Sequence, residues 1–239
     1  MKQVSFLVHR PVREFLKMPK VTDEYIESKR KMITDCAYQV CLRKPVEMVT
    51  ISDVISETGM SQGAIYRYYN GLDEILADIA TKMRSDYNII DSFEAIISDG
   101  SASIEDLTYR VFDCLAEAME SHLMDIQKLN FDFGVLAINE PVRAAKIIGD
   151  VRGQGNMEYL EKNALPGLIK RAAELGYHPS ASPEAIGQFI AASYTGIEKY
   201  CIMSACYGTG SPGRKADIRQ LFRTLAVSVI LLLGGKTND

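Results

Sequence analysis

The sequence lacks the clusters of reactive side chains that most enzymes and metal sites require. Its three histidines, His9, His122 and His178, are far apart, and no Cys, His or acidic residues have metal-ligand spacing. Five cysteines stand at positions 36, 41, 114, 201 and 206, which favours reduced thiols packed on helical faces over disulfides or zinc. No phosphate-binding glycine-rich loop is present, and Gly153-Gln154-Gly155 indicates a kink or loop. We therefore expect no catalytic residues, no metal and no cofactor.

Long hydrophobic runs and strand-like patterns are also missing. The longest apolar stretch, Leu225 to Leu233, is too short to cross a bilayer. The apolar residues near the N-terminus are interrupted by His9, Arg10 and Arg13, unlike those of a secretory signal. No run of alternating apolar and polar residues indicates a sheet, and no internal repeat is found. These absences predict a cytoplasmic, all-α protein with no membrane partner.

The net charge of −4 is unevenly distributed along the chain. Residues 1–72 hold 11 Lys and Arg against 8 Asp and Glu, a net charge of +3, which leaves −7 for residues 73–239. This asymmetry is typical of a small cationic head on an acidic body. Residues 1–21 alone carry five basic residues and one acidic residue. This extension is either a partly ordered tail or a basic arm that follows DNA phosphates or enters the minor groove.

Residues 50–69 are the most informative segment, because they indicate two short helices around a tight turn. Thr50 and Asp53 form a Thr-x-x-Asp capping box at the start of the first helix. Gly59 suits the left-handed conformation that ends this helix, and Ser61 caps the next one. A separation of about three residues is typical of a helix-turn-helix, whose second helix enters the DNA major groove.

The helix-turn-helix belongs to a predicted three-helix domain over residues 22–72. A preceding helix is expected over residues 23–43, with Thr22 as its cap. Asn70-Gly71 interrupts the chain, and a long helix is predicted from about Asp73. Residues 73–239 have helical periodicity throughout and form the second domain. Its loops are expected near residues 98–103, 139–141, 177–183 and 207–213.

This order of elements resembles the tetracycline-repressor (TetR) family of bacterial transcriptional regulators. The denser part of the resemblance is carried by Ile33, Cys36-Ala37, Thr50-Ile51, Val54, Gly59, Ser61, Gly63, Ile65-Tyr66 and Tyr68-Tyr69. A weaker part is carried by Leu168-Ile169, Ala172, Gly176, Pro179, Pro183-Glu184-Ala185 and Gly196. The resemblance implies a DNA-binding head followed by a larger helical domain for ligand binding and dimerisation. It also implies a homodimer that binds a palindromic DNA operator, acts as a repressor and is released by a small-molecule effector.

Five positions depart from the family pattern. The family usually has lysine where Gln62 and Leu72 stand and threonine where Ala64 stands, and those side chains contact phosphates. Its glycine before the second helix is Pro45 here, and its aromatic residue late in the first helix is Cys41. We expect the fold to survive these changes, with DNA affinity depending more on the remaining contacts.

Several side chains around the second helix of the motif are suited to DNA. Ala64 suits a thymine methyl group, and Gln62 suits an adenine edge. Arg67 suits a guanine or a phosphate, whereas Tyr66 and Tyr68 pair an aromatic face with a hydroxyl group. Free backbone amides at the start of the first helix attract a phosphate. The predicted DNA-binding residues are Thr50, Ser52, Ser61, Gln62, Gly63, Ala64, Tyr66, Arg67 and Tyr68, whereas Ile65 and Tyr69 are expected in the core.

Two apolar stripes near the C-terminus have the period of helices. They form either the core of a monomer or a four-helix interface with a second copy. We prefer the interface, because helix-turn-helix proteins usually recognise paired half-sites. The residues predicted there are Ile186, Phe189, Ile190, Ile197, Leu221, Phe222, Leu225 and Val229.

By resemblance, the central helices hold a small molecule whose binding changes the separation of the two recognition helices. The candidate ligand-binding residues are Phe112, Met119, Phe131, Phe133, Tyr159, Phe189 and Tyr194, although an aromatic stripe is also typical of plain core. This set has few ionisable groups and favours an apolar or weakly polar effector. The alternative function is a helical adaptor that uses the three-helix head to bind protein. An adaptor would not bind duplex DNA, whereas the affinity of a DNA-binding regulator should fall steeply as the salt concentration rises.

Overall fold

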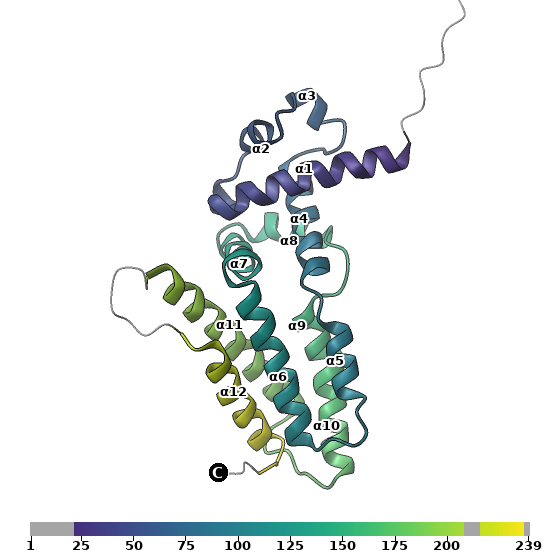
Figure 1. Cartoon of the computed structure of the whole chain (residues 1–239), viewed down its shortest axis with the longest axis vertical. Helices are drawn as coiled ribbons and strands as arrows, with labels where there is room; N and C mark the ends of the chain where they lie inside the picture. The colour runs from purple at the N-terminus through teal and green to yellow at the C-terminus, as the bar shows by residue number, and fades with distance from the viewer. Residues whose placement is uncertain (1–21, 208–215, 237–239) are drawn as a thin grey trace, which may run out of the picture.

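A computed structural model describes residues 22–207 and 216–236, and all regular elements within these ranges are helical (Figure 1). This confirms the predicted all-α class. The predicted N-terminal extension, residues 1–21, and most of the predicted loop at residues 207–213 lie outside the described residues. Within the described ranges, none of the helices has the length and apolar character needed to span a membrane.

Three helices form the head, at the top of Figure 1. They are α1 (Asp23–Arg43), α2 (Ile51–Thr58) and α3 (Gln62–Ile65), and the 3-10 turn η1 (Val46–Met48) connects the first two. α1 has the predicted bounds because the Thr22 hydroxyl accepts a hydrogen bond from the backbone N–H of Tyr25 at 3.3 Å.

The helix α4 (Leu72–Asp86) carries the chain from the head into the body. Its residues Ile75, Leu76 and Ile79 are fully buried, as their spacing predicts. They belong to a core cluster that also includes Ile33 of α1 and residues from the upper part of the body. The head therefore shares its hydrophobic core with the body.

Eight further helices and two π-helical turns make up the described part of the body. The helices are α5 (Ile90–Ile97), α6 (Ile104–Ser121), α7 (Lys128–Asn139), α8 (Pro141–Gly149), α9 (Asn156–Tyr159), α10 (Leu165–Glu174), α11 (Pro183–Tyr207) and α12 (Ile218–Leu232). The π-helical turns are η2 (Leu123–Gln127) and η3 (Leu160–Ala164). Loops occur near residues 98–103, 139–141 and 177–183, where the sequence predicts them.

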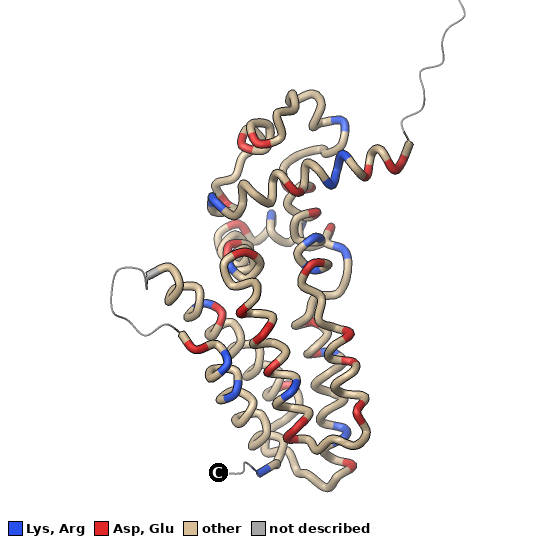
Figure 2. Tube along the Cα trace, in the orientation of Figure 1, with Lys and Arg blue, Asp and Glu red and all other residues tan. Residues whose placement is uncertain are grey.

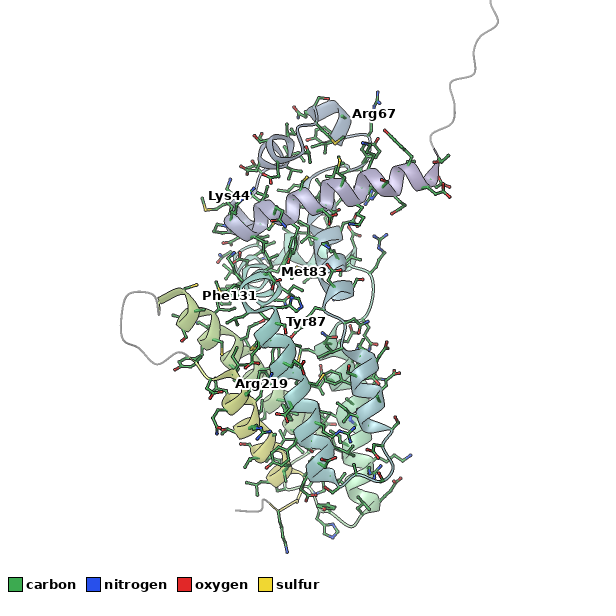
Figure 3. The ribbon with its side chains drawn as sticks, in the orientation of Figure 1. Lys44, Arg67, Met83, Tyr87, Phe131 and Arg219 are labelled. Atoms are coloured by element: carbon green, nitrogen blue, oxygen red, sulfur yellow. The ribbon has the colours of Figure 1, made fainter. Side chains whose placement is uncertain are left out.

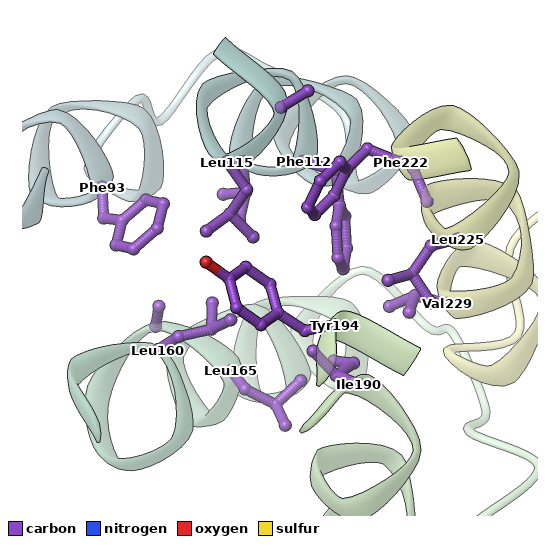
Figure 4. Packing of buried hydrophobic residues seen from close by; sticks show 14 of the residues in the cluster. Phe93, Phe112, Leu115, Leu160, Leu165, Ile190, Tyr194, Phe222, Leu225 and Val229 are labelled. Carbon is purple, nitrogen blue, oxygen red and sulfur yellow. The ribbon is translucent and has the colours of Figure 1, made fainter. Parts of the chain in front are cut away.

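A second core cluster fills the lower body between α6, α10, α11 and α12 (Figure 4). Phe112 of α6 and Phe222 of α12 are buried there, and the rings of Phe222 and Tyr194 meet edge to face at 5.9 Å. Burying a side chain of this size contributes about 1.5–3 kcal/mol to stability. α12 thus packs against both α11 and α6 of its own chain.

This packing corrects part of the predicted dimer interface. Five of its eight residues are buried inside the single chain, namely Ile186, Ile190, Phe222, Leu225 and Val229. Phe189 is exposed, and Ile197 and Leu221 are partly exposed. The prediction was wrong for the five because an apolar stripe of helical period looks the same whether it faces a partner or its own core.

Candidate DNA interface and ligand cavity

Local hydrogen bonds build the turn between α2 and α3. The backbone N–H of Thr50 donates to the Asp53 carboxylate at 2.8 Å, and the N–H of Asp53 donates to the Thr50 hydroxyl at 3.3 Å. These two bonds are the predicted capping box. Gly59 ends α2 with a φ of +65°, and the Ser61 hydroxyl accepts from the N–H of Ala64 at 3.3 Å. The capping hydrogen bonds and the glycine conformation that the sequence predicts for this turn are therefore present in the structure.

The two carboxylates of α2 are both paired with cations. The Lys44 ammonium lies 2.7 Å from the Asp53 carboxylate, and Arg43 lies 2.6 Å from Glu57. The hydrogen bond from Lys44, followed by those from Thr50, lowers the pKa of Asp53 to about 2. These pairs reduce the repulsion that a DNA phosphate would meet on this side of the head.

The α3 segment is short, but its helical turns continue to Tyr69. The N–H groups of Tyr66 and Tyr69 donate to the carbonyls of Gln62 and Ile65, each at 3.1 Å. Ile65 and Tyr69 are buried, as predicted, and anchor the segment. The side chains of Gln62 and Tyr66 face solvent.

Arg67 is the exposed cation of this segment. It projects outward beside α3 at the upper end of the molecule (Figure 3) and forms no ion pair with any other described residue. Figure 2 shows that basic and acidic residues are both spread over the head and the body. The charge of Arg67 is therefore available to a ligand.

A partly buried network of hydrogen bonds and ion pairs stabilises the C-terminal end of this segment, at Tyr68 and Tyr69. The Tyr69 hydroxyl donates to the Asp78 carboxylate of α4 at 2.8 Å. The Arg30 guanidinium lies 4.1 Å from the centre of the Tyr69 ring and donates to the Tyr68 carbonyl at 2.6 Å and to Asp78 at 2.9 Å. Burial raises the pKa of Tyr69, which keeps its hydroxyl a donor. α1, α3 and α4 are thus joined through Asp78.

A cavity of about 300 Å³ lies below the head, at the lower end of the range typical of small-molecule sites. Its wall is largely apolar and comes from α4, α6, η2, α7, α8, α11 and the segment around the start of α9. Met83, Phe133 and Ile147 are examples of its apolar lining. Figure 3 labels Met83 and Tyr87, which follow one another along the end of α4 that borders the cavity.

Residues 151–156, of which Val151, Gly155 and Asn156 line the cavity, are hydrogen-bonded to the C-terminal part of α4 and to Tyr87. Arg84 donates to the Gly153 carbonyl at 2.6 Å, and the N–H of Arg152 donates to the Thr81 hydroxyl at 3.1 Å. The Asn156 amide donates to the Tyr87 carbonyl. The loop predicted at Gly153-Gln154-Gly155 is confirmed, and Gly153 has a φ of +82°, which favours glycine.

Polar groups gather where the cavity meets the lower body. The Tyr194 hydroxyl donates to the Gln127 side-chain carbonyl at 3.2 Å. The Tyr87 hydroxyl and the Gln127 amide nitrogen are buried next to each other and to the Tyr194 hydroxyl, although neither has a hydrogen bond of good geometry among the described residues. Burial raises the pKa of Tyr87 to about 12 and raises that of Tyr194 well above its ordinary value. Burial also raises the pKa of the nearby Glu198 carboxyl to about 7.

Two ion pairs connect the α8 side of the cavity to α4. Arg143 lies 2.8 Å from Asp73, and Arg152 lies 3.1 Å from Asp78. Asp78 is the same carboxylate that holds Arg30 and Tyr69. Arg143 and Arg152 therefore link the α8 side of the cavity to the helix that carries Asp78.

Comparison with solved structures decides the fold. A putative TetR-family transcriptional regulator from Mesorhizobium loti matches with a TM-score of 0.61 and 13% identity, over 87% of this chain and 98% of that one. The fatty acid degradation regulator FadR from Bacillus halodurans matches with a TM-score of 0.58 and 15% identity, over 88% and 97%. Thermus thermophilus FadR, a TetR-family repressor in complex with lauroyl-CoA, matches with a TM-score of 0.53 and 17% identity, over 88% and 96%.

This chain has the TetR-family fold. In sequence it is 36% identical over 61 residues to an uncharacterized HTH-type transcriptional regulator, YfiR, from Bacillus subtilis. That match covers 26% of this chain and 30% of the relative. No family model matches the chain.

In this TetR fold, the nine predicted DNA-binding residues lie together in the head. Seven of them are exposed, and Ala64 and Tyr68 are partly exposed. Their contact with DNA stays a prediction, as does the choice between repressor and activator.

Two of the seven predicted ligand-binding residues, Phe133 and Tyr194, line the cavity of the TetR fold. The other five are not part of its wall. Phe112 and Met119 are buried in the lower core, Tyr159 stacks on Phe93 at 6.3 Å, Phe189 is exposed, and Phe131 is not in the wall. Met83, Tyr87 and Ile147 also line the cavity and are not among the residues predicted from the sequence. Helical period identifies a buried face, but it does not distinguish a filled contact from a cavity wall.

Proposed function

We propose that this protein is a ligand-responsive transcriptional regulator that binds duplex DNA as a homodimer through α3. The observation that supports this best is a capped helix-turn-helix whose second helix is anchored by Ile65 and Tyr69 and presents its other side chains to solvent. The solved TetR-family regulators with the same fold support the same function.

In this proposal α3 enters the major groove. Gln62 and Ala64 contact base edges, Arg67 contacts a guanine or a phosphate, and the Tyr66 and Tyr68 hydroxyls contact the backbone. Thr50 and Ser52 place the amides at the start of α2 against a phosphate.

The homodimer would form through the exposed face of α11 together with α12. Phe189, Tyr200 and Met203 are 41%, 55% and 44% exposed and recur at helical spacing. The small residues Ala192 and Gly196 lie between them and allow two helices to approach closely. A second copy related by a twofold axis would cover this stripe and place two α3 segments on paired half-sites.

Release from DNA would follow from ligand binding in the cavity. A ligand that binds more tightly when α4 and α8 are further apart would displace the ion pair between Arg152 and Asp78, and so change the position of the head. The largely apolar wall favours an apolar or weakly polar effector, and the similar Thermus thermophilus repressor binds lauroyl-CoA. Steric repression is the regulatory mode that the resemblance to the family implies.

Selection of duplexes from a random pool tests the proposal. We expect enrichment of an inverted repeat with half-site centres about 34–36 Å apart, and a dimer by light scattering at micromolar concentration. Failure to enrich any duplex would favour the alternative helical adaptor, and a monomer would contradict the dimer.

A further inference from the structure

Arg84 is the one charged side chain in the cavity wall within the ranges that the structure describes. The wall residues Ala80, Met83, Arg84 and Tyr87 recur at the three- and four-residue spacing of one helix face. The other described residues of the wall are apolar or uncharged, and neither Asp nor Glu is among them. A cation therefore borders a space whose surroundings are otherwise largely apolar.

The positive charge of Arg84 is not neutralised by another described residue. Arg84 is partly exposed, and one of its five N–H donors binds the Gly153 carbonyl, with Nη1 at 2.6 Å. The pKa of the Glu158 carboxyl is lowered mainly by the hydrogen bond from Lys162 at 2.8 Å, and the charge of Arg84 is the smallest cause. Arg84 itself forms no ion pair with a described carboxylate. A partly buried charge without a partner is unfavourable, so a ligand that supplies the partner gains affinity.

The surrounding loop holds Arg84 in place. The Gly153 carbonyl that accepts from Arg84 belongs to the same loop as Asn156. The Asn156 side chain donates to the Tyr87 carbonyl and accepts from the N–H of Ile89 at 3.1 Å, so both of its polar atoms are engaged. The remaining N–H groups of Arg84 form no hydrogen bond with a described residue, and their planar fork matches the two oxygens of a carboxylate.

The single charge of the wall favours a monoanion. A phosphate monoester carries a charge of about −1.5 to −2 at pH 7, and in the described wall its second charge would meet no cation. A carboxylate carries one negative charge and accepts two parallel hydrogen bonds from one arginine. Arg84 therefore favours a carboxylate over a phosphate.

We infer that the cavity binds a monocarboxylate with an apolar body, and that the Arg84 guanidinium pairs with its carboxylate group. The apolar body of the molecule lies against Met83, Phe133 and Ile147. This inference rests on the ligand-binding part of the proposed function and adds one charged end to the apolar effector of that proposal.

Three probes with the same apolar body separate the possible ligand chemistries. They are 4-phenylbutanoate, a monocarboxylate; its methyl ester, which is neutral; and 4-phenylbutyl phosphate. In calorimetric titrations of the full chain without DNA at about pH 7.5, we expect 4-phenylbutanoate to bind at least about tenfold more tightly than the ester, which corresponds to one charge-assisted hydrogen bond. We also expect it to bind more tightly than the phosphate. Equal or weaker binding of the carboxylate than of either other probe, or no binding of any probe, overturns the inference.

Two variants assign the preference to Arg84. Arg84→Gln removes the charge but keeps an amide that can donate to Gly153, so it should bind the ester as the parent does and lose the tenfold preference for the carboxylate. Arg84→Lys keeps the charge without the fork and should retain part of the preference. Arg67→Gln is the matched control, because Arg67 is exposed, lies outside the cavity wall and forms no ion pair with another described residue.

Thermal unfolding checks that each variant is folded. An unchanged preference in folded Arg84→Gln overturns the assignment. Equal weakening of the carboxylate and the ester in this variant also overturns it, because that result would mean that Arg84 only maintains the shape of the cavity.

These measurements also separate the inference from the proposed function. A carboxylate preference that depends on Arg84, with DNA affinity unchanged by the bound carboxylate, would contradict the proposed release mechanism and support the inference. DNA binding that the neutral ester releases as well as the carboxylate does would support the proposed function and overturn the inference.

Discussion

Replacing Arg67 with alanine should weaken DNA binding strongly while leaving the fold intact. Arg67 is exposed beside α3 and makes no ion pair with another described residue, so its removal breaks no ion pair inside the described head. We expect the midpoint of urea unfolding to stay close to that of the parent, since surface substitutions of this kind change stability by about 0.5 kcal/mol or less.

The expected loss of affinity follows from the number of DNA contacts removed. A bidentate contact to guanine contributes about 1–3 kcal/mol, and a twofold dimer uses Arg67 twice. The variant should therefore lose about 2–6 kcal/mol of binding free energy, or roughly 30-fold to more than 10⁴-fold in affinity. If Arg67 binds phosphate instead, the salt dependence of log K should also become shallower, by about one unit for each phosphate that the variant no longer neutralises.

Fluorescence anisotropy with a duplex selected by the parent protein measures both quantities across a salt series. Lys170→Ala is the matched control, because it removes one positive charge from an exposed position on α10, which belongs to the body. An affinity of Arg67→Ala within about twofold of the parent, with the control unchanged, would refute the assignment of α3 as the DNA-reading element.

Three further predictions concern the carboxylates. Asp78→Asn removes the charged acceptor shared by Tyr69, Arg30 and Arg152, and should lower the free energy of unfolding by about 2 kcal/mol in urea titrations. Asp53 has a folded-state pKa of about 2, below its unfolded value, so its contribution to stability is present above about pH 4 and is lost as pH falls towards 2. In urea titrations at a series of pH values, the free energy of unfolding of Asp53→Asn should therefore fall less than that of the parent over this acid range. Glu198 has a folded-state pKa of about 7, above its unfolded value, so the free energy of unfolding should fall as pH rises from about 4.5 to 7. Glu198→Gln should not show this fall, and it should be more stable than the parent at pH 8 by up to about 3 kcal/mol. A parent protein whose stability is flat over that interval would contradict the buried position of Glu198.

The head was predictable from sequence because its geometry depends on local chemistry. The capping box of Thr50 and Asp53, the positive φ of Gly59 and the Ser61 cap each involve residues within about four positions of one another. The sequence therefore placed the helix boundaries of the motif and both anchors of α3.

The cavity and the dimer face were not predictable in the same way. The cavity is assembled from α4, α6, η2, α7, α8, α11 and the loop before α9, and no periodic pattern indicates which buried positions leave space between them. The stripe on α12 was assigned to a partner, yet α6 of the same chain covers Phe222 and Val229.

A methylation-protection footprint on the selected duplex tests the central claim most directly, because it reports which groove the protein occupies. The account predicts protection of guanine N7 atoms in two major-groove segments whose centres are about 34–36 Å apart, and loss of that protection with Arg67→Ala. Bound protein that leaves every guanine N7 reactive, or protects the same atoms without Arg67, would contradict it.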